Sequence, residues 1–204
     1  MLKETFIELL TNYTEEKSLI NDSWLEIEQN YSEKKRYYHN LSHLENLLNQ
    51  LLQVKDKIEN WNRILFTLFY HDIIYLSSNS DNEEESAKLA EKRMKQINVP
   101  EQIIESCKLQ ILATKNHFEK INEDTNYFLD ADLSILGTTY ETYKTYSQNV
   151  RKEYASYPNL IYNPGRKKVL KNFLDMQRIY KTEYFYNKFE TKAKENLLKE
   201  LSTL

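Results

Sequence analysis

The chain has 204 residues, of which 40% are apolar and 29% are charged, and its net charge is −3. This length and balance predict one globular domain over residues 1–204 and exclude a disordered chain. The near-neutral charge argues against a dedicated nucleic-acid or membrane-surface protein, and no apolar run is long enough to span a bilayer. With Cys107 as the single cysteine and no signal-type segment after Met1, we expect a cytoplasmic protein.

The two glycines exclude a glycine-rich phosphate loop, and so few glycines and only three prolines favour long helices with short joints. Because no segment alternates as a strand does, the sequence predicts an all-α fold. The apolar spacing predicts helices at residues 5–19, from about residue 22, after residue 40, and at 58–75, 82–97, 100–117, 128–136, 139–157, 166–180 and 183–201.

Single residues are predicted to begin or end these elements. Asn40 is a suitable N-cap, and Gly137 is expected as the residue that closes the 128–136 helix. Turns are predicted at residues 157–158 and, because of Pro164, at residues 163–165.

The apolar run of residues 66–70 ends in the adjacent pair His71-Asp72. The other histidines, His39, His43 and His117, also lie at the edges of apolar helices, and His39 and His43 would share one face of a continuing helix. Imidazole and carboxylate together suit a divalent ion that leaves coordination positions for water. Taken singly, each histidine is better explained as a core or surface residue, so the metal hypothesis depends on the set.

Two further carboxylates, Asp130 and Asp132, flank Ala131 inside the apolar segment 128–136. A carboxylate in such a segment is unfavourable unless it is paired or bound to a cation. Because Asp130 and Asp132 are two positions apart on a helix, their side chains cannot both face inward. The pattern alone therefore leaves open which of them is the ligand.

The order His, His-Asp, Asp resembles the HD superfamily of metal-dependent phosphohydrolases. Residues 38–43 are similar to the Tyr-His-Asn-x-x-His segment of cyclic-nucleotide phosphodiesterases, which are distant relatives. A bacterial group of predicted HD phosphohydrolases of similar length is a closer match and covers about residues 24–196. Its segments correspond to residues 69–75, 81–87, 114–117, 129–137, 151–154 and 165–166.

This resemblance implies a single-domain, HD-type helical bundle with one or two divalent metal ions (Mn, Mg, Co, Ni, Fe or Zn) in a helical cleft. It implies hydrolysis of a phosphoester, often in a nucleotide, by a metal-bound hydroxide, with His39 protonating the leaving group. The nucleotide-binding glutamine and aromatic clamp of the phosphodiesterases have no match here, so cyclic-nucleotide specificity does not follow. By matching positions, and with Asp132 preferred to Asp130, the implied metal ligands are His43, His71, Asp72 and Asp132.

Other residues have two interpretations each. Glu83 shares a helix face with Ala87 and could orient water or a ligand, or it could be an acid in a first helical turn. His117 could bind phosphate or a second metal, or could be a helix C-terminal histidine. Arg151 and Arg166 carry planar forks that suit phosphate oxygens, although a surface or structural ion pair explains each slightly better.

The expected partner is a small phosphorylated substrate, such as a nucleotide, and not a membrane or a nucleic acid. Two other functions stay open. One is a nucleotide-sensing module that keeps the metal site without catalysis. The other, less favoured, is an HD-type di-iron oxygenase, which needs more histidine ligands than this chain offers beyond His117. The sequence names neither the substrate nor the oligomeric state.

Overall fold

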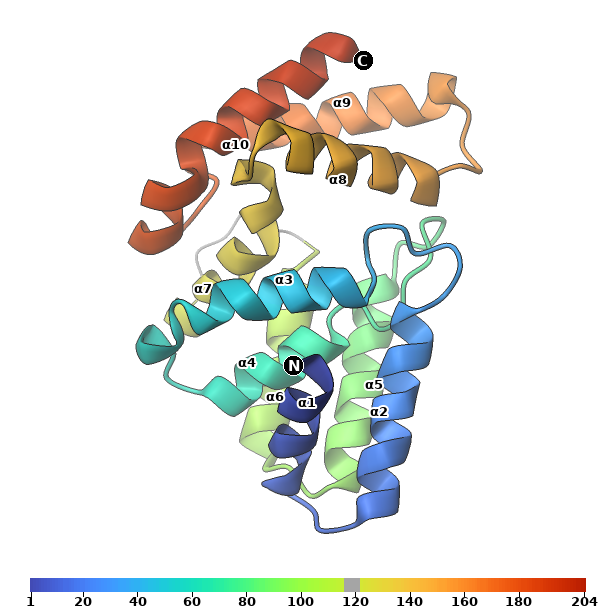
Figure 1. The fold of residues 1–204 in the computed structure, drawn as a ribbon, viewed down its shortest axis with the longest axis vertical. Coiled ribbons are helices and arrows are strands. Elements are labelled where there is room, and N and C mark those ends of the chain that lie inside the picture. The colour runs from blue at the N-terminus through green and yellow to red at the C-terminus, as the bar shows by residue number, and fades with distance from the viewer. Residues whose placement is uncertain (116–121) are drawn as a thin grey trace.

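The computed structural model describes residues 1–115 and 122–204, and every regular element in these ranges is a helix (Figure 1). The predicted all-α fold is therefore confirmed. None of the described helices combines the length and apolarity that a membrane span requires. The elements, with two 3₁₀ turns labelled η, are α1 (Leu2–Thr11), α2 (Lys17–Tyr31), α3 (Leu41–Leu52), η1 (Lys55–Lys57), α4 (Trp61–Tyr70), α5 (Asn82–Gln96), α6 (Glu101–Ala113), α7 (Glu123–Asp132), η2 (Leu133–Gly137), α8 (Tyr140–Glu153), α9 (Asn159–Asp175) and α10 (Glu183–Thr203).

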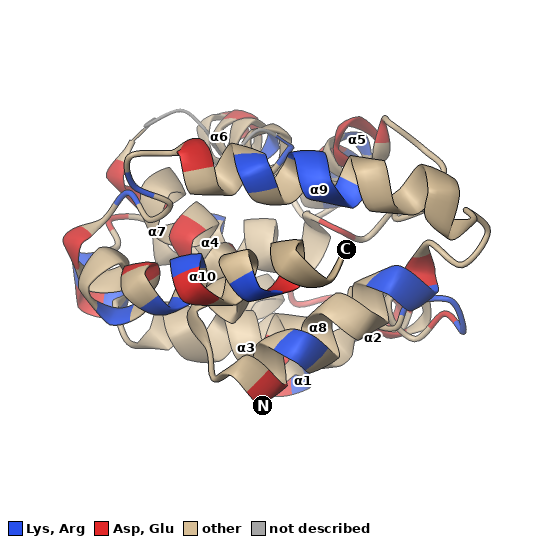
Figure 2. Cartoon of the chain, turned by 90° about the horizontal axis from the view of Figure 1, so that it is seen from above, with Lys and Arg blue, Asp and Glu red and all other residues tan. Residues whose placement is uncertain are grey.

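The helices form two groups that meet at α3 and α7 (Figure 1). In the first group, α5 packs along α6, α4 packs on α6, and α1 packs on α2. In the second group, α10 packs on η2 and α9. One contiguous apolar core runs from Leu2 to Leu197, which fits a single domain. Basic and acidic residues alternate along α10 (Figure 2), as the Lys-Glu interleaving of the sequence predicts, although Glu190 and Glu200 are buried.

Helix α4 is the central element because its last two turns are buried on every side. All seven residues from Ile64 to Tyr70 are buried, and a helix that is apolar all round must be covered by its neighbours. Phe69 of α4 meets Phe6 of α1 edge to face, with ring centroids 4.8 Å apart. This packing fixes the end of α4, and His71 is the residue that follows it.

The N-terminus of α3 is fixed as predicted. The side chain of Asn40 accepts hydrogen bonds from the backbone N–H groups of Ser42 and His43 at 2.9 and 3.3 Å. An N-cap of this kind satisfies donors that the helix itself leaves unpaired. The cap therefore sets the position of His43 in the first turn of α3.

Several predicted helix ends were wrong. α2 begins at Lys17, ahead of the predicted start near Asp22. α4 begins at Trp61 and ends at Tyr70, whereas the prediction covered residues 58–75. Asn60 explains the start, because its side chain accepts from the backbone N–H of Arg63. Beyond Tyr70 the chain leaves the helix, and Arg36 donates to the carbonyl oxygens of Asp72 and Ile73.

The predicted turn at residues 163–165 was also wrong, because α9 continues through Pro164. Proline removes one helical hydrogen bond, the one that would end on the carbonyl of Leu160. Leu160 is 88% exposed, so this loss falls on a part of the helix next to water. The proline is tolerated here for that reason.

Gly137 does not close a helix in the left-handed conformation, because no glycine in the described ranges has a positive φ. It ends η2 and lies against α10. A Cβ atom on Gly137 would stand 2.7 Å from the carbonyl oxygen of Phe189 and 2.9 Å from its Cα. Glycine is needed here for close approach of two backbones, which the sequence pattern did not reveal.

Candidate metal centre and its cleft

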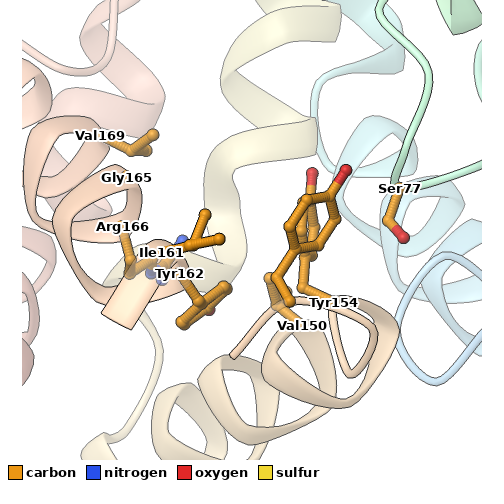
Figure 3. A pocket seen from close by; sticks show the side chains of 9 residues that line it. Ser77, Val150, Tyr154, Ile161, Tyr162, Gly165, Arg166 and Val169 are labelled. Carbon is orange, nitrogen blue, oxygen red and sulfur yellow. The ribbon is translucent and has the colours of Figure 1, made fainter. Parts of the chain in front are cut away.

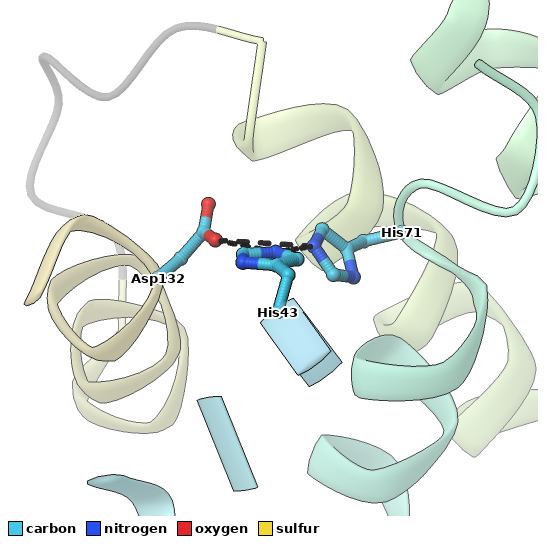
Figure 4. Close-up of side chains that lie close together, drawn as sticks. All are labelled: His43, His71 and Asp132. Carbon is cyan, nitrogen blue, oxygen red and sulfur yellow. Dashed lines mark hydrogen bonds and ion pairs between the residues drawn. The ribbon is translucent and has the colours of Figure 1, made fainter. Parts of the chain in front are cut away.

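Three helices bring two histidines and an aspartate together (Figure 4). His43 comes from the first turn of α3, His71 from the end of α4 and Asp132 from the end of α7. The Nε2 atoms of His43 and His71 lie 3.2 Å apart. Asp132 Oδ1 lies 3.3 Å from His43 Nε2 and 3.9 Å from His71 Nε2. Both histidines are buried.

Asp72 adds a second carboxylate to the group. Its Oδ2 lies 3.1 Å from His71 Nε2 and 3.8 Å from His43 Nε2. The four residues that the resemblance implies as ligands thus lie around one point. Asp130, the alternative to Asp132, does not join them. Its carboxylate accepts from the backbone N–H groups of Lys181 and Thr182 and from the Thr182 hydroxyl.

The donor set fits a divalent cation. His71 Nδ1 lies 3.0 Å from the carbonyl oxygen of Leu68, and an N–H donated there leaves the lone pair of Nε2 facing His43 and the carboxylates. A histidine whose second nitrogen is held by a backbone carbonyl is the usual arrangement for a metal ligand. Two imidazole nitrogens and two carboxylates suit zinc, manganese, iron, cobalt or nickel.

The charges of the group also favour a cation. Burial alone would lower the pKa of His71, but Asp72 and Asp132 outweigh burial and raise that pKa to about 9. Burial alone would raise the pKa of Asp72, whereas His71 holds it well below its usual range. The Asp72 carboxylate therefore stays ionised in a mostly desolvated place and draws positive charge toward it.

Arg36 holds the turn that carries Asp72. It is 7% exposed, and its guanidinium donates to the carbonyl oxygens of Asp72 at 2.6 Å and Ile73 at 2.7 Å. The backbone N–H of Asp72 donates to the Tyr31 hydroxyl at 3.2 Å, which also holds the turn. Sequence reasoning missed Arg36, because an isolated arginine 36 positions before its partner gives no pattern.

His39 lies beside the group and is paired with Glu153 of α8. The distance from His39 Nδ1 to Glu153 Oε2 is 2.7 Å, and Glu153 Oε1 accepts from the backbone N–H groups of Tyr38 and His39. The Tyr75 hydroxyl donates to the same carboxylate at 3.1 Å. With Nδ1 engaged, Nε2 is the nitrogen of His39 that can meet a ligand.

This pairing favours the protonated form of His39. Burial alone would lower the pKa of His39, but the hydrogen bond to Glu153 and the charge of Asp72 raise it above its ordinary value. Burial would raise the pKa of Glu153, whereas His39 and the two backbone N–H groups lower it. The sequence held one signal for Glu153, since it stands in the matched segment 151–154.

A cleft of about 490 Å³ opens over Asp72 and Asp132. His39 and Glu83 line it, so Glu83 lies where its helix face predicts. Lys115 also lines it, 3.8 Å from Glu83 and 2.6 Å from Glu84. Aromatic rings complete the wall, among them Tyr38, Tyr75, Tyr146, Tyr154 and Phe173.

The remaining predicted residues lie elsewhere. Arg166 is buried and forms two hydrogen bonds with the Glu200 carboxylate, at 2.7 and 2.9 Å. Arg151 donates to the carbonyl oxygens of Tyr154 and Tyr157. Arg166 thus forms the structural ion pair of its alternative interpretation, whereas Arg151 is held by neutral oxygens, and the described lining of the cleft includes neither arginine. His117 lies outside the described residues.

Comparison with protein-family models, curated proteins and solved structures gives no match to this chain. The geometry of the cluster and its cleft is therefore the basis for a functional proposal.

Proposed function

We propose that this protein is a divalent-metal-dependent phosphohydrolase whose ion is held by His43, His71, Asp72 and Asp132. The observation that carries the proposal is that His43, His71 and Asp132 converge from three helices, with Asp72 beside them, beneath a cleft that His39 lines. A divalent ion bound there would polarise a phosphoryl oxygen and lower the pKa of a coordinated water.

His39 is the group proposed to protonate the leaving oxygen. A general acid must carry a proton near neutral pH and must reach the reacting atoms. Glu153 supplies the first condition, because it raises the pKa of His39, and the place of His39 in the cleft wall supports the second. Glu153 is a positioning residue, since it acts through His39.

Glu83 and Lys115 are placed to orient the substrate. Both line the cleft, and Lys115 is a cation within reach of a phosphate that enters it. The cleft volume lies in the range of about 300–1,000 Å³ that is typical of small-molecule sites. A small phosphoester, such as a nucleotide, suits this size and the aromatic wall.

Turnover by the metal-loaded protein tests the proposal. Nucleoside phosphates and an aryl phosphate are incubated with protein loaded with Mn²⁺, Mg²⁺, Co²⁺ or Ni²⁺. We expect hydrolysis with at least one ion, and its loss in His71→Asn and Asp132→Asn. His39→Gln should lower kcat by about 10²–10⁴-fold without changing metal content.

Other outcomes would point to other functions. Turnover that is unchanged in both ligand variants would contradict a phosphohydrolase centre at this position. Tight nucleotide binding without turnover would favour a nucleotide-sensing module. Two iron ions per chain with substrate-dependent uptake of O₂ would favour an oxygenase.

A further inference from the structure

A second cavity, a slot of about 420 Å³, lies between the end of α8 and α9 (Figure 3). Val150 and Tyr154 form one wall, and Ile161, Tyr162 and Val169 face them from α9. The two walls are aliphatic and aromatic side chains. A slot with such walls suits a flat, apolar group better than a charged one.

The slot adjoins the cleft over the candidate metal centre. Tyr154 and Val169 line both cavities, so the two share a wall. Tyr154 is hydrogen-bonded to Tyr75, whose hydroxyl donates to Glu153, the partner of His39. A ligand that filled both cavities would place one end near His39 and the other between α8 and α9.

The chemistry of the slot differs from that of the cleft. Arg166 is the charged residue among the described residues that line the slot, and its guanidinium is committed to Glu200. The ring of Tyr154 lies 5.8 Å from that of Tyr162 and 6.0 Å from that of Tyr157, and all three tyrosines line the slot. The slot thus offers ring faces and hydroxyl edges rather than a site for phosphate.

We propose that this slot binds the aromatic base of a nucleotide whose phosphate lies at the metal centre, an assignment that rests on the proposed phosphohydrolase function. A nucleobase is planar, and any of the common bases can stack on a tyrosine ring. Its ring nitrogens and oxygens can bond to tyrosine hydroxyls at the slot edge. An alkyl chain would fill the same volume but would leave those hydroxyls without a ligand partner.

Gly165 gives a direct way to close the slot. It lines the slot from α9, and a Cβ atom built on it meets nothing within 4 Å. Its backbone has no positive φ, so the backbone conformation does not disfavour a side chain there. Gly165→Phe should therefore place a ring in the slot without unfolding the helix. Lys168→Phe is the matched control, because Lys168 is exposed on the same helix and does not line the slot.

The first measurement is binding without catalysis. Adenosine, guanosine, cytidine and uridine are titrated into the metal-free full chain by calorimetry. We expect at least one nucleoside to bind, Gly165→Phe to weaken that binding at least about tenfold, and Lys168→Phe to bind as wild type. Tyr162→Leu, which removes one ring from the wall, should weaken it as well. Binding of no nucleoside, or equal binding by Gly165→Phe, would overturn the proposal.

The second measurement separates this proposal from the function on which it rests. The ratio of kcat/KM for a nucleoside monophosphate to that for glycerol phosphate should fall at least about tenfold in Gly165→Phe, through KM. If wild type hydrolyses both but the ratio does not change, the slot assignment is wrong and the phosphohydrolase proposal stands. If wild type hydrolyses neither, that function fails, and the nucleoside titration still decides the slot. Preference for an alkyl phosphate that Gly165→Phe abolishes would also overturn a base-binding slot.

Discussion

The carboxylates of Asp130 and Asp132 serve different parts of the protein although they stand two positions apart on α7. Asp132 Oδ1 lies 3.3 Å from His43 Nε2, in the candidate metal centre. Asp130 is fully buried and accepts three hydrogen bonds from Lys181 and Thr182, just before α10 begins. Helix α7 thus carries one carboxylate that lies in the candidate metal centre and another that holds the segment before α10.

This relationship predicts opposite effects of two matched substitutions. Asp132→Asn removes a charged ligand and should weaken Mn²⁺ binding more than about tenfold, because even supporting residues change metal affinity by 10–100-fold. Asp130→Asn should keep metal binding and lower the free energy of unfolding by about 1–3 kcal/mol, since it weakens charge-assisted hydrogen bonds. Calorimetric titration and urea unfolding measure the two effects. Equal metal affinity in the two variants would contradict the ligand assignment.

Arg36→Lys should loosen the turn that carries Asp72. A lysine ammonium cannot donate from two fixed nitrogens to the carbonyl oxygens of Asp72 and Ile73, as the guanidinium does. We expect Mn²⁺ affinity to fall by about 10–100-fold, as when a residue behind a metal ligand is changed. Lys35→Arg, at the exposed neighbouring position, is the matched control, because it exchanges the same two side-chain types where no contact to the turn is made. The prediction fails if both variants bind Mn²⁺ as wild type does.

The pair His39 and Glu153 should make stability depend on pH. The pKa of His39 is raised above 6.5, so its contribution is complete below pH 6.5 and is lost as the pH rises through the raised value. The pKa of Glu153 is lowered below 4.5, so its contribution is present above pH 4.5 and is lost as the pH falls through the lowered value. Both contributions are complete between these two values.

His39→Gln tests this window, because glutamine keeps a hydrogen-bond donor and does not titrate. In chelator-treated protein, wild type should exceed the variant by about 1–2 kcal/mol near pH 5.5 and by less near pH 9. Urea unfolding at the two pH values measures the difference. A gap that grows with pH would show that the ion pair does not form.

The two glycines should respond in opposite ways to alanine. Gly137→Ala places a Cβ atom against the backbone of Phe189 and should destabilise the protein by about 1–3 kcal/mol. Gly165→Ala adds a methyl group to an open helical position and should stabilise it by about 0.5–1 kcal/mol. Thermal unfolding of both variants measures the effects. Destabilisation by Gly165→Ala would contradict the open position.

Arg166→Ala should destabilise the protein by about 3–5 kcal/mol, because it leaves the buried Glu200 carboxylate with the Tyr143 hydroxyl but without its cation. The double variant Arg166→Met with Glu200→Met should recover much of that loss, since a buried ion pair is often replaceable by apolar side chains. Urea unfolding compares the three proteins. A phosphate-binding arginine would behave differently, with stability unchanged and KM raised.

The sequence predicted most of the helical pattern and the members of the candidate metal centre. Periodicity located the apolar helices, and Asn40 marked the start of α3 because a cap is a local feature. The positions His43, His71, Asp72 and Asp132 came from a resemblance in order and spacing. The predicted turn at residues 163–165 was wrong because sequence alone does not show exposure. Pro164 continues a helix because the carbonyl it leaves unpaired belongs to Leu160, which is next to water.

Long-range partners could not be predicted in the same way. The contact of Glu153 with His39 joins residues 114 positions apart, and no local pattern encodes it. The close approach of Gly137 to Phe189 likewise depends on how α10 packs. The arginines show the same limit, because a planar fork suits a phosphate and a buried Glu200 equally well. Only the fold shows which partner is present.

The separation of His39 from Glu153 has a consequence for synthesis on the ribosome. A chain grows from its N-terminus, so His43, His71, Asp72 and Asp132 all emerge before Glu153 does. The candidate ion-binding residues therefore leave the ribosome ahead of the acid partner of His39. Under the proposed function, the ligands for the cation would be available first, and the ion pair that raises the pKa of His39 would form only when α8 folds onto the segment that carries His39.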